Sequence, residues 1–156
     1  MWELEGLNET GYFQPPDEDS AMREHQSNSR GMRAPMLNGD TVFVVDDEPV
    51  IGDTVATILN QAGYEATAFD DARLAMAAAA ESSPDLLISD VMMPGMSGVE
   101  LAIHFRNLHP RCKILLFSTV ATTADPLVNA RLQGYDFDLL TKPLHPAKLL
   151  ERLKTL

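Results

Sequence analysis

From Thr41 onward, five short apolar runs alternate with five longer stretches that have helical periodicity. The apolar runs are TVFVV, YEATAF, LLIS, KILLF and FDLLT, and the helical stretches cover 49–63, 70–83, 98–109, 125–134 and 146–156. Three of the runs (TVFVV, LLIS and KILLF) are almost continuously apolar, which is typical of strands covered by helices on both faces. Strands that alternate with helices in this way predict an α/β fold with a doubly wound, five-stranded parallel sheet.

Residues that favour helix ends stand at several of these boundaries. Pro49 opens the first helical stretch and Gly63 closes it, the usual placement of proline and glycine at helix ends. Asp70 or Asp71 can cap the second stretch, and Gly134 closes the fourth. These signals support the division into strands and helices that the apolar pattern predicts.

The chain divides near residue 40. Residues 1–40 are rich in Gly, Pro, Ser, Asn, Asp and Glu, and their 8 acidic and 3 basic residues give a net charge of −5. Such a segment buries too little apolar area to offset its chain entropy, so we expect disorder over 1–40 and one folded domain over 41–156. The aromatic and leucine residues within 2–13 could instead dock as a short peptide, and Met32 or Met36 could be the true start.

Composition excludes some classes of protein. With 23 acidic and 12 basic residues, the net charge is −11, which argues against non-specific binding of nucleic acid. The single cysteine, Cys112, allows no internal disulfide, and we expect a half-buried thiol in a protein of the reducing cytoplasm. No apolar stretch approaches the ~20 residues of a membrane span, so we expect no membrane insertion.

Polar side chains follow the predicted strands at one end. Asp46 and Asp47 follow the first strand, Asp90 the third, Ser118 the fourth and Lys142 the fifth. Because the carboxyl ends of parallel strands share an edge at which ligands bind, we expect these side chains to meet. Taken singly, each has a plainer explanation as a helix cap, a turn residue, a strand end or a solvated lysine. Together they predict a site for a divalent metal and a phosphoryl group.

The residue types at this edge suit phosphoryl transfer to a carboxylate. A carboxylate can attack a phosphoryl group and become an acyl phosphate. Mg²⁺ suits such a site, because it binds one or two carboxylates, several waters and phosphate oxygens together. A lysine adds a point charge on a further phosphate oxygen, and a hydroxyl group can donate a hydrogen bond to the third. No GxGxxG or GxxxxGK[ST] loop follows the first strand, which disfavours nucleotide binding there.

Four blocks within 41–156 carry these residues in order: VFVVDDEP, LLISDVMMPGMSGVEL, ILLFST and LLTKPLHPAKLL. They supply an acidic pair, a central aspartate, a hydroxyl residue and a lysine–proline step. This set resembles the receiver domain of the two-component response-regulator family over the whole segment. The resemblance implies a flavodoxin-like (CheY-like) fold with strand order 2-1-3-4-5.

The resemblance also implies a role for each residue on the metal side. Asp90 would be the phosphoacceptor. Asp47 would bind Mg²⁺ directly, and Asp46 would act mainly through the metal's water shell. The backbone carbonyl of Met92 would be the third protein ligand. Aspartate-nucleophile phosphatases instead need a second acid two residues after the nucleophile, the position that Met92 occupies here, so that enzyme class is disfavoured.

Further roles are implied on the phosphoryl side. Lys142 would contact the phosphoryl group, and a cis peptide bond to Pro143 would fix its approach. Ser118 would move toward the phosphoryl group after phosphorylation. These assignments describe a protein that catalyses only its own phosphoryl transfer and slow autodephosphorylation, and is otherwise no enzyme.

Two switch positions depart from the family's usual pattern. Receivers usually carry Tyr, Phe or His three residues before the lysine, where this chain has Leu139. Phe137 lies on the same side of the strand by parity and could partly substitute. The residue after the hydroxyl position is usually Ala or Gly, and here it is Thr119. Its branched side chain could narrow the approach of attacking water, so we expect the acyl phosphate to hydrolyse slowly.

Three functional hypotheses follow for a chain that ends just after its last helix. The first is a stand-alone receiver that a histidine kinase phosphorylates and that signals by protein contact. The second is a relay intermediate that passes phosphate to a histidine phosphotransfer protein, and the third is a non-phosphorylated interaction module.

Phosphorylation should shift a two-state equilibrium on the face made by the fourth helix, fifth strand and fifth helix. Its charged residues are Asp125, Arg131, Asp136, Asp138, Lys148, Arg152 and Lys154. The oligomeric state is left open.

Overall fold

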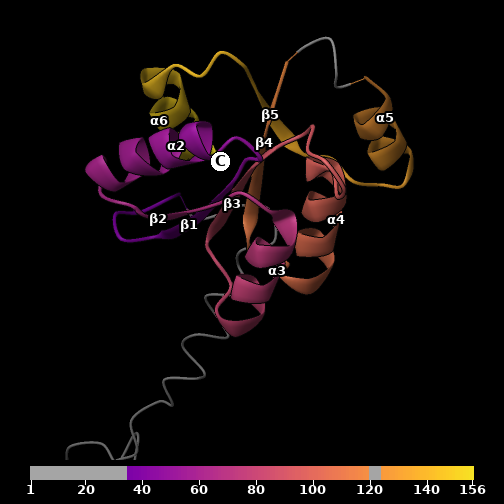
Figure 1. The fold of residues 1–156 in the computed structure, drawn as a ribbon, viewed down its shortest axis with the longest axis horizontal. Coiled ribbons are helices and arrows are strands. Elements are labelled where there is room, and N and C mark those ends of the chain that lie inside the picture. The colour runs from indigo at the N-terminus through magenta and orange to yellow at the C-terminus, as the bar shows by residue number, and fades with distance from the viewer. Residues whose placement is uncertain (1–34, 120–123) are drawn as a thin grey trace, which may run out of the picture. The chain divides into compact units, whose positions relative to one another are not determined.

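The computed structural model describes residues 35–119 and 124–156 of the chain (Figure 1). The predicted disorder of residues 1–40 therefore lies almost wholly outside the described residues. The compact unit that contains the sheet begins at Pro35, and Met36 is buried in its core. Packing of the folded domain thus starts ahead of the boundary predicted at residue 40.

Five parallel strands form one sheet. They are β1 (Thr41–Val45), β2 (Glu65–Phe69), β3 (Leu86–Asp90), β4 (Lys113–Ser118) and β5 (Asp138–Thr141). Their order across the sheet is β2-β1-β3-β4-β5, and every neighbouring pair is parallel. The predicted fold class and strand order are confirmed.

The helices that connect the strands cover both faces of the sheet (Figure 1). They are α2 (Pro49–Gln61), α3 (Ala72–Glu81), α4 (Gly98–Leu108), α5 (Ala124–Leu132) and α6 (Pro146–Thr155). Side chains from α2 and α6 join one apolar cluster with one face of the sheet, and side chains from α3, α4 and α5 join a second cluster with the other face. The helices therefore bury the central strands on both sides.

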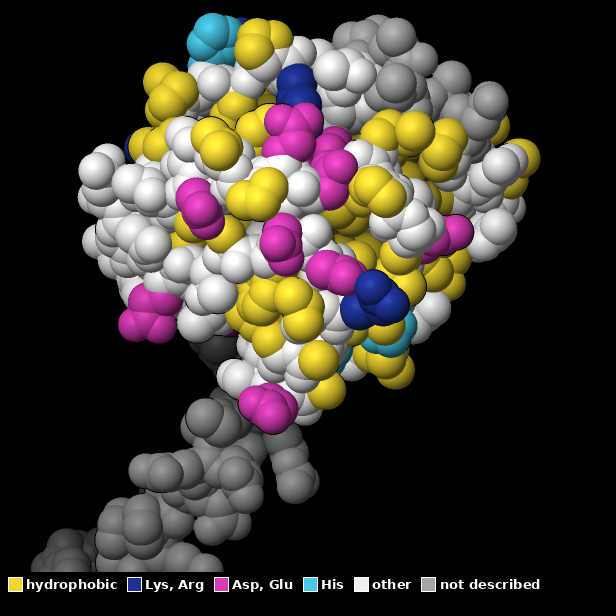
Figure 2. Space-filling model, in the orientation of Figure 1, with side chains coloured by type: hydrophobic (Ala, Val, Ile, Leu, Met, Phe, Trp, Pro, Cys, Tyr) yellow, Lys and Arg dark blue, Asp and Glu magenta, His cyan; other side chains and the backbone are white. Residues whose placement is uncertain are grey.

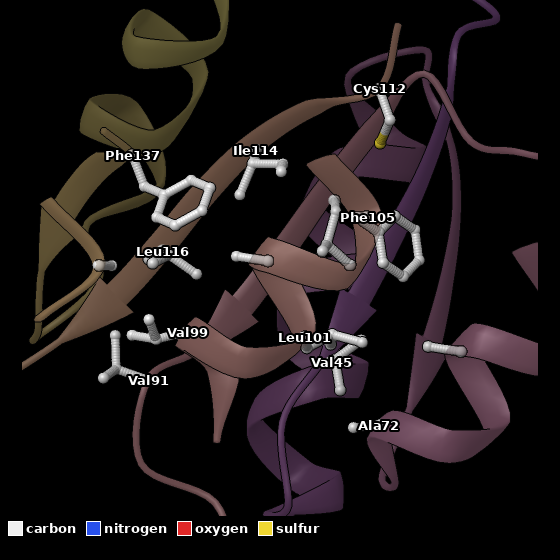
Figure 3. Close-up of a cluster of buried hydrophobic side chains, with 14 of the residues drawn as sticks. Val45, Ala72, Val91, Val99, Leu101, Phe105, Cys112, Ile114, Leu116 and Phe137 are labelled. Carbon is white, nitrogen blue, oxygen red and sulfur yellow. The ribbon is translucent and has the colours of Figure 1, made fainter. Parts of the chain in front are cut away.

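The two central strands explain the continuous apolar runs in the sequence. Every residue of β3 and β4 is buried, because each face of these strands meets a helix layer. Phe105 of α4 is 0% exposed and belongs to the same apolar cluster as Ile114 and Leu116 of β4 (Figure 3). Full burial of a side chain of this size contributes about 1.5–3 kcal/mol. Cys112 lies in the same cluster and is buried rather than half-buried, which corrects the sequence-based expectation (Figure 3).

The helix ends follow local chemistry that the sequence shows only in part. Pro49 is the first residue of α2, Asp71 caps α3 by accepting a hydrogen bond from the Arg73 N–H, and Gly63 has a positive φ of 101°. Helix α4 begins with a capping box that sequence reasoning missed. The Ser97 side chain accepts from the Glu100 N–H, and the Glu100 side chain accepts from the Ser97 N–H. This box fixes the start of α4, directly after the loop that follows Asp90.

Candidate functional site

Three carboxylates converge where β1 and β3 end. These strands are neighbours in the sheet, so Asp46 and Asp47 after β1 lie beside Asp90 at the end of β3. Each of the three offers a carboxylate oxygen, and these oxygens lie within 4.8 Å of one another. Asp46 is 3% exposed and Asp90 9%, whereas Asp47 is exposed. The predicted meeting of the acidic pair with the central aspartate is thus present.

Lys142 supplies a positive charge to this group from the end of β5. Its Nζ lies 3.4 Å from Oδ1 of Asp90 and 3.5 Å from Oδ2 of Asp46. The Glu48 N–H donates a further hydrogen bond of 2.9 Å to Oδ1 of Asp46. One lysine faces three carboxylates, so the cluster keeps a formal charge of −2. Carboxylate oxygens at this spacing and charge fit a hard divalent cation.

Burial sets the electrostatics of Asp90. Loss of solvent raises the pKa of this carboxyl above its usual value; Lys142 opposes the rise, and Asp46 adds to it by repulsion. The Met92 N–H also lowers the pKa through a hydrogen bond to the carboxylate. The charged form of Asp90 is therefore incompletely compensated by the protein's own groups. A cation at the cluster would complete this compensation.

The loop after Asp90 is held against the start of α4. A Cβ atom added to Gly98 would lie 1.8 Å from the main-chain oxygen of Asp90, so no side chain fits there. The Gly98 N–H donates to the Val91 carbonyl at 2.8 Å, and the Val91 N–H donates to the Phe117 carbonyl at 2.9 Å. Sequence reasoning placed Gly98 only as a residue near the helix start. The close approach of Gly98 to the Asp90 backbone depends on tertiary packing. In the sequence, its only sign is the glycine itself.

Ser118 is buried at the end of β4, next to β3 and β5 in the sheet. Its hydroxyl group donates to the carbonyl of Thr119 at 2.9 Å, and its own carbonyl accepts from the Lys142 N–H at 2.9 Å. Thr119 is exposed. The peptide bond between Lys142 and Pro143 is cis, which confirms that expectation. The Ser118 carbonyl therefore holds the backbone of Lys142, while the Ser118 hydroxyl group is engaged with the carbonyl of Thr119.

Leu139 of β5 is one of the two departures from the usual switch pattern, and it lies on the same side as Phe137, the residue just before the strand. Leu139 is half-buried and packs against the cluster that contains Phe137, which confirms that the two residues share a side. Phe137 itself is buried, with its ring stacked on Tyr135 at a centroid distance of 6.1 Å. The Arg106 guanidinium lies 5.3 Å from the Phe137 ring centroid. Phe137 thus contacts both Tyr135 and Arg106. That Phe137 takes the place of the usual switch aromatic stays a prediction.

Charged pairs mark the face around β5 and α6. Arg152 donates to Asp138 at 2.9 Å, and Arg131 lies 3.7 Å from Asp136. The Arg131–Asp136 pair is largely solvent-exposed, so it contributes about 0–1 kcal/mol, whereas the Arg152–Asp138 pair is partly buried. The Asp125 side chain predicted for this face lies outside the described residues. Elsewhere, Figure 2 shows acidic side chains scattered among apolar ones on the visible face, with few basic ones.

Comparison with known proteins matches this geometry to a family. The family model for the response regulator receiver domain matches residues 42–154. The chain belongs to the response regulator receiver family. Receivers of this family act in phosphorylation-based signalling by two-component systems, and the acidic cluster, the lysine and the strand order of this chain agree with that assignment.

Named relatives and solved receivers support the family at the level of sequence and fold. The phosphate regulon transcriptional regulatory protein PhoB of Pseudomonas aeruginosa is 34% identical over 119 residues, which cover 74% of this chain and 51% of PhoB. The chemotaxis response regulator CheY4 of Vibrio cholerae has a TM-score of 0.64 at 32% identity, covering 75% of this chain and 98% of CheY4. A CheY-like receiver from Methanospirillum hungatei has a TM-score of 0.68 at 27% identity, covering 75% of this chain and 92% of that one.

The match is limited to the receiver. The transcriptional regulatory protein CreB of Escherichia coli is 31% identical over 120 residues, which cover 77% of this chain and 52% of CreB. The chain thus spans about half the length of PhoB and of CreB. Within the described parts of the receiver, no helix has the length and apolar character needed to cross a membrane.

Proposed function

We propose that this receiver is phosphorylated on Asp90 by the phosphohistidine of a histidine kinase, in a reaction that needs Mg²⁺. The observation that carries the proposal is the Asp90 carboxylate, which lies 3.4 Å from Lys142 and within a cluster of three acids. Relatives named as response regulators support the kinase as the class of donor.

The reaction is a phosphoryl transfer between two protein side chains. An Asp90 carboxylate oxygen attacks phosphorus; the new O–P bond forms as the N–P bond to the donor imidazole breaks, and the released imidazole keeps the electron pair and later takes a proton. Lys142 offsets the charge of the transferred oxygens from its position beside Asp90. Asp46, Asp47, Asp90 and the Met92 carbonyl would hold the metal, which when bound neutralises charge on the phosphoryl oxygens.

Two roles on the phosphoryl side follow from the same proposal. Ser118 would exchange its hydrogen bond to the Thr119 carbonyl for one to a phosphoryl oxygen, which requires its hydroxyl group to rotate. Thr119, which is exposed beside this hydroxyl residue, would slow the approach of water to the acyl phosphate. The chain would thus catalyse only its own phosphorylation and slow dephosphorylation. It would act in the cytoplasm, without direct contact to nucleic acid, by phosphorylation-dependent binding to an effector protein.

Incubation with acetyl phosphate and Mg²⁺ tests the proposal directly. Intact mass should show one adduct of ~80 Da, as expected for a single phosphoryl group, and both Asp90→Asn and removal of Mg²⁺ with EDTA should abolish it. An adduct of the same size on Asp90→Asn would refute the assignment of the acceptor. A chain that takes up no phosphoryl group would favour the non-phosphorylated interaction module.

The second candidate is a relay intermediate that hands the phosphoryl group to a histidine phosphotransfer protein. The exposure of Asp47 and Met92 beside Asp90 favours it, because a second imidazole needs an open approach to the acyl phosphate. Mixing the phosphorylated chain with such a protein distinguishes the two. Rapid loss of the adduct from this chain with a matching gain on the histidine protein supports the relay, and hydrolysis alone supports the effector role.

A further inference from the structure

Ser89 places a hydroxyl group inside the apolar core directly beside Asp90. The residue is fully buried at 0% exposure, and its partners across the sheet are Val45 in β1 and Leu116 in β4. Both partners belong to the apolar cluster under α3, α4 and α5. A buried hydroxyl group is costly unless it has a hydrogen-bond partner. The partner here is the main-chain carbonyl of Asp90, which accepts the Ser89 hydrogen bond at 2.9 Å.

The peptide unit after Asp90 is held at several atoms. Its carbonyl oxygen accepts from Ser89 and lies so close to Gly98 that an added Cβ would sit 1.8 Å away. Its N–H, which belongs to Val91, donates to the Phe117 carbonyl at 2.9 Å. Rotation of this peptide plane would turn the Asp90 backbone and redirect its carboxylate. Only one of these contacts, the Ser89 hydrogen bond, comes from a side chain.

We propose that Ser89 is a positioning residue for phosphoryl transfer; the proposal rests on the function proposed above for Asp90. The Ser89 hydroxyl group fixes the peptide after Asp90, and through it the direction of the carboxylate that faces Lys142 at 3.4 Å. Ser89 acts through the backbone of Asp90 rather than on the reacting atoms. Positioning of this kind changes rate, because a small error in the placement of a nucleophile lowers the fraction of productive encounters.

The chain offers a matched control for this contact. The Cys112 thiol donates to the carbonyl of the next residue, Lys113, at 3.3 Å, in the same i to i+1 arrangement and in the same apolar cluster. Cys112 precedes β4, so it lies at the opposite end of the strand from the acidic cluster. Cys112→Ala therefore removes a comparable core contact without touching the peptide after Asp90. We expect Ser89→Cys to keep a weaker donor in place, in the same arrangement as the Cys112 thiol.

The experiment compares the full-length wild type with Ser89→Ala, Ser89→Cys and Cys112→Ala. Phosphorylation by acetyl phosphate is followed by intact mass across a range of Mg²⁺ concentrations, and circular dichroism confirms that each variant is folded. Ser89→Ala should lower the initial rate at saturating Mg²⁺ by about fivefold to tenfold, with little change in the Mg²⁺ concentration that gives half the rate. Ser89→Cys keeps only a weaker donor, so it should recover part of the loss and lie about threefold below wild type. Cys112→Ala should stay close to the wild-type rate.

The possible results separate this inference from the function on which it rests. Equal phosphorylation rates for wild type and folded Ser89→Ala would overturn the positioning role alone. A loss of rate in Cys112→Ala as large as that in Ser89→Ala would also overturn it, because it would indicate general loosening of the core. A wild type that takes up no phosphoryl group would overturn the proposed function as well. If Ser89→Ala does not fold, Ser89→Cys decides: a rate at least about twofold below that of Cys112→Ala supports the role, and an equal rate refutes it.

Discussion

Replacement of Gly98 by alanine should disable the candidate site by pushing a helix away from it. Gly98 is the first residue of α4, and an added Cβ would meet the Asp90 main-chain oxygen at 1.8 Å, the Asp90 carbonyl carbon at 2.7 Å and the Val91 Cα at 2.9 Å. All three atoms belong to the backbone, so no side-chain rotation can relieve the contact. Either α4 or the end of β3 must shift.

The size of the shift follows from the same distances. Cβ contacts below 3.0 Å are essentially never found, so the 1.8 Å contact must open by at least 1.2 Å. A misplacement of about 1 Å at a reacting group can lower a rate by about 100-fold, and overpacking of this kind costs about 1–3 kcal/mol of stability. The preference of helices for alanine over glycine, about 1 kcal/mol, offsets part of that cost and leaves a net loss of stability of about 0–2 kcal/mol.

Gly52 provides the control. It lies in α2, where an added Cβ would meet only the Cβ atoms of Ala68 at 3.7 Å and Asp46 at 3.8 Å, both ordinary contacts. Gly52→Ala should therefore raise the free energy of unfolding by about 0.4–1 kcal/mol and leave phosphorylation unchanged. The assay is urea unfolding together with the initial rate of acetyl phosphate uptake. If Gly98→Ala takes up phosphate within twofold of Gly52→Ala, the argument from backbone contact is wrong.

Four further predictions use other parts of the molecule. Burial raises the pKa of the Cys112 thiol to about 12, from an ordinary value of 9.0, so stability should be intact below pH 9 and be lost as pH rises toward 12. Urea unfolding should show wild type losing about 1.4 kcal/mol more than Cys112→Ala between pH 7 and 10, and equal slopes would contradict this. Mg²⁺ at 100 times its dissociation constant should stabilise wild type by about 2.7 kcal/mol and Asp47→Asn far less, which thermal unfolding can measure. Asn60 makes two hydrogen bonds to the backbone of the edge strand β2, at 2.8 and 3.2 Å, so Asn60→Ala should cost about 1–2 kcal/mol and promote aggregation on light scattering. Thr119→Ala should shorten the lifetime of the acyl phosphate, and an unchanged half-life would refute a gating role.

The parts of this structure that the sequence predicts are those governed by periodicity and strand ends. Continuous apolar runs identify β3 and β4 as central strands, and the parallel arrangement then brings Asp46, Asp90 and Lys142 to one edge whatever the details of packing. Contacts that depend on three-dimensional packing cannot be predicted from these patterns. Nothing local to Ser89 shows that its hydroxyl group bonds to the next carbonyl, and Met36 lies beyond the apolar pattern that defines the domain. The capping box at Ser97 and Glu100 did have a local signal in its spacing, and only its position after an irregular loop obscured it.

The charge balance at this site suggests two roles for a metal. It should speed phosphorylation of Asp90, and it should also stabilise the phosphorylated chain against unfolding. Lys142 is shared between Asp46 and Asp90, at 3.5 and 3.4 Å. A phosphoryl group on Asp90 carries more negative charge than the carboxylate it replaces, so it should draw the ammonium group away from Asp46. Asp46 is 3% exposed, and loss of the partner of a buried charge typically costs about 3–5 kcal/mol. Its remaining hydrogen bond, from the Glu48 N–H, offsets only part of that cost. Asp46 and Asp47 would help to hold a divalent cation, and its positive charge would compensate Asp46 in place of the lysine. We therefore expect chelation of Mg²⁺ after phosphorylation to lower the free energy of unfolding of the phosphorylated chain by more than it lowers that of the unphosphorylated chain.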